Sequence, residues 1–187
     1  MALEYELRDF TVDEYHRMAD AGVLPPGERV ELLDGKIVRM SPIGRRHWIL
    51  HGLIVAYLNR MLPQYGIVGQ GSFPMGTRDE PQPDVAILRD ALQTYFDRAL
   101  TPNDVLAIVE VADSSLRTDL GPKLALYARF AVPSYLVVDV AGNCLIHHTE
   151  PNDLAYANAV TVGTGDTFTL AAVPGITLAA SAFLSPS

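Results

Sequence analysis

The sequence predicts an α/β fold in which both faces of a central β-sheet are covered. Residues 105–112, VLAIVEVA, are apolar on both faces, which is typical of a buried central strand. Residues 134–140 form a second such run, and an apolar helical segment that ends before Pro133 lies between the two. This strand–helix–strand order is typical of α/β architectures. We therefore expect the middle of the chain to form the core of the sheet.

The composition is that of a globular protein, and residues 1–187 are expected to form one domain. Of the 187 residues, 49% are hydrophobic and 19% are charged. A chain of this length buries about 70% of the surface that it exposes when unfolded. The net charge of −8 argues against a nonspecific nucleic-acid-binding protein, because that class needs clustered Lys and Arg side chains. It does not exclude a nuclease whose acids hold a metal ion.

The sequence gives no indication of membrane insertion or secretion. The longest apolar-rich stretch, residues 48–62, contains His51, Asn59 and Arg60 and is too polar to span a bilayer. The start of the chain lacks the charged and apolar regions of a secretory signal. The single cysteine, Cys144, excludes an internal disulfide bond. Together these features favour a cytoplasmic protein.

The N-terminal region is predicted to form a helix followed by a hairpin. Residues 11–14 match a capping box, and the helix is expected to end near Gly22. Residues 30–40 contain two β-prone runs around an Asp-Gly dipeptide, which favours a tight turn. Alternation along the first strand places Glu31 among residues that are expected to be buried. A solvated edge position explains a glutamate there equally well.

A long helix is expected after Gly44. The apolar residues that follow helical spacing in it are Leu50, Leu53, Ile54, Tyr57, Leu58 and Met61. His47 and His51 share another face, and their spacing is one that zinc ligands use on helices. The zincin pattern also requires a glutamate where this chain has Trp48, and no third ligand is evident. A zinc hydrolase is therefore a minor alternative.

Arg45, Arg46 and His47 form a compact basic cluster at the predicted start of this helix. Helix N-termini favour phosphate groups through their free N–H groups. The cluster is therefore either a phosphate-binding turn or an ordinary solvated first turn.

Two acids and one lysine are tied to core elements in the middle of the chain. Asp84 opens one apolar strand, and Glu110 lies inside the central one. An ionised carboxylate in such a place is costly unless a cation or hydrogen bonds satisfy it. Lys123 follows in the next helix, which Thr118 or Asp119 is expected to cap. These residues predict a divalent-metal site for phosphodiester chemistry.

The remaining segments are assigned to edge strands, loops and short elements. Residues 66–76 contain too many glycines for a central strand, so an edge strand and a turn are expected there. Residues 89–103 are predicted to form a short helix or loop, and residues 144–148 a strand. The tail around residues 166–175 is expected to add small strands.

The ordered set of motifs resembles the Uma-two family of the PD-(D/E)XK nuclease superfamily. The motifs that carry the resemblance are ELLDGKI at residues 31–37, PDV at 83–85, EV at 110–111, TD at 118–119, Lys123, Tyr127, YLVVD at 135–139, GD at 165–166 and PG at 174–175. Each motif alone is weak, but their order is specific and covers most of the chain. The resemblance implies a restriction-endonuclease-like fold, with a mixed central β-sheet flanked by helices behind the N-terminal helix and hairpin.

The resemblance also implies a magnesium-dependent nuclease site, in which Mn²⁺ can substitute for Mg²⁺. Asp84 and Glu110 match the metal-binding acids, and the Val111 carbonyl is a third expected ligand. Glu31 matches the acid of the early hairpin and is expected to act in catalysis, by binding the metal through a water or by positioning the nucleophile. The superfamily lysine normally stands two residues after the second acid, where this chain has Ala112. Lys123 would supply it from the next helix, because a small residue at 112 leaves room on that face. Tyr127 is assigned a packing role.

The expected activity is endonucleolytic hydrolysis of nucleic acid, with DNA as the expected substrate and a homodimer as the expected assembly. The main alternative is a catalytically inactive nuclease-fold module for nucleic-acid binding or dimerisation, which the acidic net charge favours. A serine hydrolase is disfavoured because the chain has no Gly-x-Ser-x-Gly motif.

Overall fold

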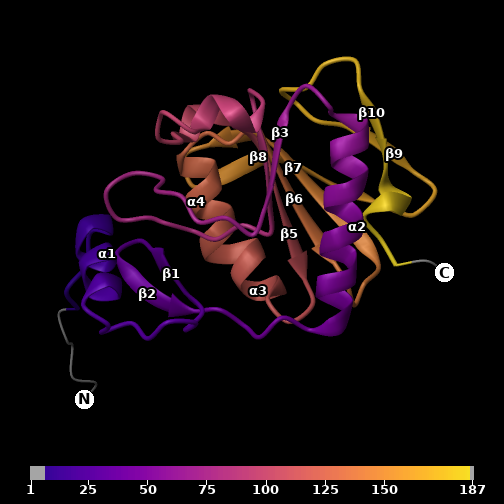
Figure 1. Ribbon diagram of the computed structural model, residues 1–187. Coiled ribbons are helices and arrows are strands. Elements are labelled where there is room, and N and C mark those ends of the chain that lie inside the picture. Colours follow the sequence, from indigo (N-terminus) through magenta and orange to yellow (C-terminus); the bar gives the residue numbers. More distant parts are fainter. Residues whose placement is uncertain (1–6, 186–187) are drawn as a thin grey trace.

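The computed structural model describes residues 7–185, which form a six-stranded mixed sheet with helices on both faces (Figure 1). The strands lie in the order β3 (Gly66–Gly69), β4 (Val85–Leu88), β5 (Val105–Ala112), β6 (Ser134–Asp139), β7 (Cys144–Asn152) and β8 (Ala155–Val162). Strands β5 and β6 are parallel, and the other neighbouring pairs are antiparallel. Every residue of β5 is buried. The predictions of an α/β fold and of a central strand at residues 105–112 are confirmed.

The two faces of the sheet carry separate hydrophobic clusters. Helix α2 (Arg45–Met61) covers one face, and the hairpin of β9 (Thr167–Thr169) and β10 (Thr177–Ala179) lies beside it (Figure 1). The other face is covered by α4 (Leu124–Arg129) and the segment before it. Because side chains alternate along a strand, Val109 and Val111 contact the α2 cluster, while Ile108 and Ala112 contact the α4 cluster. Glu110 therefore points toward the α4 face.

The N-terminal helix and hairpin form as predicted. Helix α1 (Val12–Asp20) starts with the expected capping box, and β1 (Val30–Leu33) pairs with β2 (Lys36–Arg39). The hairpin is joined to the loop before β4 by two backbone hydrogen bonds between Leu32 and Glu80, at 2.8 and 3.2 Å. This link brings the hairpin to the start of β4, where Asp84 lies.

The helical segment after β5 starts earlier than predicted. It begins with α3 (Leu116–Thr118) and continues through a π-helical segment, η3 (Asp119–Lys123), into α4. The prediction that Thr118 or Asp119 caps the helix is therefore wrong. Pro122 explains the wider turn, because proline has no N–H to donate and its ring crowds the carbonyl of the preceding turn. Lys123 consequently lies inside the helical segment and not in an exposed first turn.

Two further expectations about elements differ from the structure. Leu53 is 52% exposed, although Leu50, Ile54 and Leu58 are buried as predicted. These three residues are spaced by four, so α2 contacts the sheet along a narrow line that leaves Leu53 to one side. The tail forms the small strands β9 and β10 as expected, but β8 belongs to the main sheet and no strand was predicted at its residues. Its mostly exposed residues lack the apolar alternation that identifies a strand.

The remaining elements are short turns and an edge strand. In the described part of the chain, 3₁₀ turns lie at Leu92–Tyr95, Pro102–Asp104 and Ala180–Ala182. Strand β3 is an edge strand, as predicted for the glycine-rich segment. Among the helices formed by residues 7–185, none has the length and apolar character that crossing a membrane requires.

Buried histidines in β7 predict a loss of stability in acid. Burial, with a smaller contribution from His148, lowers the pKa of His147 to about 4. Such an imidazole contributes full stability above its unfolded-state pKa of about 6.5, and this contribution is lost as the pH falls toward the folded-state pKa. As the pH decreases between these two values, the free energy of unfolding, measured with urea, should fall more steeply for the wild type than for His147→Leu. Parallel profiles for the two proteins would contradict the assignment.

Candidate active site

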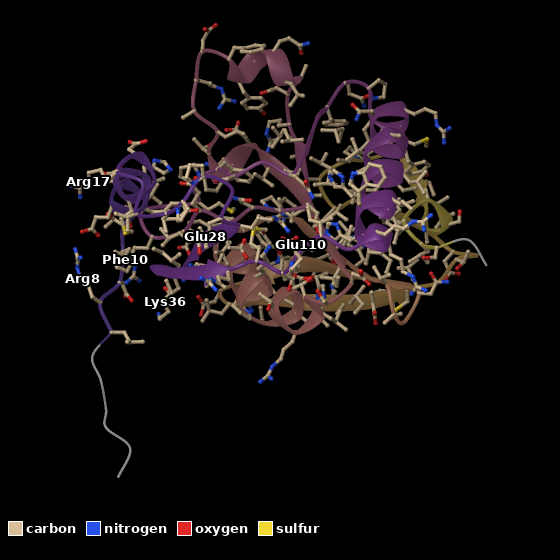
Figure 2. All side chains as sticks on the ribbon, turned by 60° about the horizontal axis from the view of Figure 1, so that its bottom comes forward. Arg8, Phe10, Arg17, Glu28, Lys36 and Glu110 are labelled. Carbon is tan, nitrogen blue, oxygen red and sulfur yellow. The ribbon has the colours of Figure 1, made fainter. Side chains whose placement is uncertain are left out.

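The register of β4 and β5 brings Asp84 and Glu110 together. Val85 lies opposite Val109, so Asp84 lies beside Glu110 at the mouth of β4. The backbone N–H of Asp84 donates to Glu110 Oε2 at 3.3 Å. Asp84 is 7% exposed and Glu110 is 2% exposed. Figure 2 shows Glu110 near the middle of the molecule. The two acids predicted to act together therefore share one buried location.

Helix α2 and strand β5 both contribute hydrogen-bond partners to Asp84. Its Oδ2 accepts a hydrogen bond from the Val111 N–H at 2.7 Å and lies 2.9 Å from His47 Nε2. Its backbone carbonyl lies 3.0 Å from His51 Nε2. Both histidines come from the N-terminal half of α2, which therefore contacts the start of β4. The side chain of Asp84 is thus fixed before any ligand is considered.

Lys123 lies between two carboxylates. Its Nζ donates to Glu110 Oε1 at 3.1 Å and is 3.2 Å from Glu31 Oε2, which also accepts the Gln82 N–H at 3.1 Å. Lys123 is only 4% exposed. Burial lowers the pKa of Lys123, but the carboxylates of Glu110, Glu31 and Asp119 raise it more, so the net pKa lies above its ordinary value. The ammonium group therefore stays charged at neutral pH.

Tyr127 contributes more than packing. Its hydroxyl donates to Glu110 Oε1 at 3.0 Å, and the residue is fully buried. Burial raises the pKa of Tyr127 well above its ordinary value, and the negative charge of Glu110 raises it further. The phenol therefore remains a hydrogen-bond donor to this carboxylate. Its spacing of four residues from Lys123 on one helix was the sequence signal for this role.

A pocket of about 70 Å³ opens onto these groups. Asp84, Glu110, Glu31, Lys123 and Asp119 line it. Asp119 is 2% exposed, and its Oδ2 accepts the Ser115 hydroxyl at 2.6 Å. With Asp113, five acids line the pocket, against the three cationic side chains of Lys123, Arg29 and Arg39. This excess of acids favours binding of a cation.

Two carboxyl groups of the pocket are weaker acids than usual, chiefly because they are buried. Burial raises the pKa of Glu110 well above its ordinary value, Lys123 opposes the shift, and Asp84 adds to it. Burial likewise raises the pKa of Asp119, and the Ser115 hydrogen bond opposes it. A divalent cation would favour the ionised form of both groups.

The donor set fits Mg²⁺, which prefers oxygen ligands and keeps several waters. Asp84 Oδ1 accepts no hydrogen bond from residues 7–185, so one carboxylate oxygen is open. The Val111 carbonyl accepts the Asp113 N–H at 3.1 Å and retains a second lone pair. Within residues 7–185, no three His, Cys, Asp or Glu side chains gather as a metal cluster. Any metal here would therefore have few protein ligands and several waters.

The two histidines on α2 do not form a zinc site with a third ligand in the described part of the chain. Their rings stack with centroids 6.5 Å apart and planes inclined by 8°, and each Nε2 contacts Asp84. His47 thus belongs to the pocket, whereas Arg45 and Arg46 are exposed beside it. Of the basic cluster Arg45, Arg46 and His47, only His47 lines the pocket, and the two arginines lie on the surface.

Comparisons with known proteins agree with this fold. A family model of Uma2, described as putative restriction endonuclease, matches residues 12–181. The structure is similar to the crystal structure of a putative nuclease belonging to DUF820 from Anabaena variabilis, with a TM-score of 0.71 and 11% identity. The similarity covers 93% of this chain and 97% of that one. No curated protein matches the sequence. Since the family model spans most of the chain, the protein belongs to the Uma2 family.

Proposed function

We propose that this protein is a Mg²⁺-dependent endonuclease that hydrolyses phosphodiester bonds, with DNA as its substrate. The observation that carries the proposal is the shared pocket of Asp84, Glu110 and Lys123. Membership in a family described as putative restriction endonucleases supports the same class of reaction. The small pocket suits a hydrated cation and one phosphate group, so the rest of the substrate would lie across the surface around it.

In this proposal Asp84, Glu110 and the Val111 carbonyl hold the metal ion. Bound Mg²⁺ supplies polarisation of the phosphate and a more acidic water. Lys123 has three N–H donors, of which Glu110 and Glu31 engage two. The third can orient a water or stabilise charge that develops on the phosphate. Glu31 holds Lys123 in place, and Tyr127 does the same for Glu110.

The test is a cleavage assay with duplex DNA, single-stranded DNA and RNA of one sequence. We expect cleavage with Mg²⁺ or Mn²⁺, none with EDTA, and none by Asp84→Ala. Absence of cleavage of every substrate by folded wild-type protein would favour the inactive nuclease-fold module. A homodimer and a cytoplasmic location stay predictions.

Exposed arginines beside the pocket are expected to contact the substrate backbone. Arg45 and Arg46 directly precede His47 at the start of α2. Arg60 lies at the other end of that helix, and Arg89 follows β4. Arg45→Ala with Arg46→Ala should weaken binding of labelled DNA and lower the slope of log affinity against log salt by roughly one to two. The affinity and its salt dependence can be measured by fluorescence anisotropy, in a buffer that contains Ca²⁺ and no added Mg²⁺ or Mn²⁺.

The matched control for this pair is Arg60→Ala with Arg89→Ala, which removes the same charge from exposed positions elsewhere. Its salt slope should stay near the wild-type value. An equal fall in both double variants would show that net charge, and not this edge of the pocket, governs binding.

A further inference from the structure

Asp84 is contacted at two points by one helix. His47 Nε2 lies 2.9 Å from the carboxylate Oδ2, and His51 Nε2 lies 3.0 Å from the backbone carbonyl. The histidines are one helical turn apart, and their rings are nearly parallel at 8°. The side chains of His47 and Asp84 are only 12% and 10% exposed. Helix α2 thus fixes both the main chain and the side chain of this acid.

The chemistry of the acceptors decides which nitrogen of His47 carries hydrogen. A carboxylate oxygen has only lone pairs, so Nε2 must donate to it. The Nδ1 atom of His47 is buried and has no hydrogen-bond partner within residues 7–185. A buried N–H without a partner is costly, so hydrogen at Nδ1 is disfavoured. The geometry therefore selects the tautomer with hydrogen on Nε2.

These contacts distinguish the two carboxylate oxygens of Asp84. Oδ2 accepts hydrogen bonds from His47 and from the Val111 N–H, at 2.9 and 2.7 Å. Oδ1 accepts none from the described residues, and Asp84 lines the pocket. Rotation of the carboxylate would break both bonds to Oδ2. Oδ1 is thereby the oxygen left for a cation.

We propose that His47 is a positioning residue that presents Asp84 Oδ1 to a divalent cation. The proposal rests on the proposed metal site, and it adds a residue that the sequence motifs did not assign to catalysis. Hydrogen-bond partners of metal-binding carboxylates typically contribute 10–100-fold to metal affinity or activity. His47 is expected to act through Asp84 without contacting the metal itself.

The experiment compares Mn²⁺ affinity, by isothermal titration calorimetry, in His47→Gln and His47→Asn. The Gln amide nitrogen reaches about as far as Nε2, whereas the Asn amide nitrogen corresponds to Nδ1. His47→Asn should weaken Mn²⁺ binding about 10–100-fold, and His47→Gln should restore most of it. The metal-free melting temperatures of the two variants should be alike, which separates positioning from folding.

Asp84→Asn separates this proposal from the proposed function. If Asp84→Asn leaves Mn²⁺ affinity unchanged, the assignment of the metal site is wrong, and so is the role assigned to His47. If Asp84→Asn abolishes binding but His47→Asn binds like the wild type, the metal site stands and the positioning role is overturned. Equal losses in His47→Gln and His47→Asn overturn it as well, because the hydrogen bond would not be the cause.

A measurement on the wild-type protein does not depend on how the variants fold. Histidine ¹⁵N NMR reports which ring nitrogen carries hydrogen. We expect the Nε2–H tautomer for His47 and a change in its signals when Mg²⁺ is added. The Nδ1–H tautomer would overturn the proposal.

Discussion

Replacement of Lys123 by methionine should reduce the single-turnover cleavage rate about 10²–10³-fold. The reason is that the ammonium group is the only lysine charge in the pocket and is held by Glu110 and Glu31 at 3.1 and 3.2 Å. Methionine keeps an apolar stem of similar length and removes the charge. The single-turnover rate at saturating metal is the quantity to measure, since it excludes product release.

The same variant should also be less stable, by about 3–5 kcal/mol, because it leaves buried carboxylates without their cation. This expectation follows from the burial of Lys123, whereas an exposed first-turn lysine would have had little effect. Urea unfolding without metal measures it. Lys36→Met is the control, since Lys36 is the chain's other lysine and is exposed on the hairpin. Cleavage by Lys123→Met at the wild-type rate would show that the assigned role is wrong.

Removal of both metal-binding acids should abolish the stabilisation that divalent cations give. Ligand that binds only the folded state stabilises it, by about 2.7 kcal/mol at a hundred times the dissociation constant. Mg²⁺ or Mn²⁺ should therefore raise the melting temperature of the wild type. In Asp84→Asn with Glu110→Gln the rise should vanish, because both carboxylates of the proposed site are gone.

The control for this experiment must remove the same charge elsewhere. Glu150→Gln with Asp153→Asn changes two exposed acids near the turn between β7 and β8, away from the pocket. Its metal-dependent rise should match the wild type. If the rise disappears in the control or persists in the pocket variant, the cation binds somewhere other than beside Asp84 and Glu110.

The sequence alone determined most of the central elements and the acids of the proposed site. Apolar runs are local signals, so residues 105–112 could be identified as a central strand and Glu110 as a costly buried acid. The Asp-Gly hairpin and the capping box are likewise local. A shared site for Asp84 and Glu110 was predicted from their places on apolar strands and from the resemblance to a family. The register of β4 and β5 brings the two residues together, and the family model confirms the family.

Only the tertiary structure decided which side chains meet these acids. His47 contacts Asp84 across 37 positions of sequence, and Glu31 reaches Gln82 across 51. Such contacts depend on how the hairpin and α2 dock, and single residues carry no local signal of docking. The burial of Lys123 likewise depended on the π-helical turn at Pro122, where the expected capped first turn would have exposed it. Local patterns therefore gave the strands and acids, while packing between distant elements gave the partners that orient them.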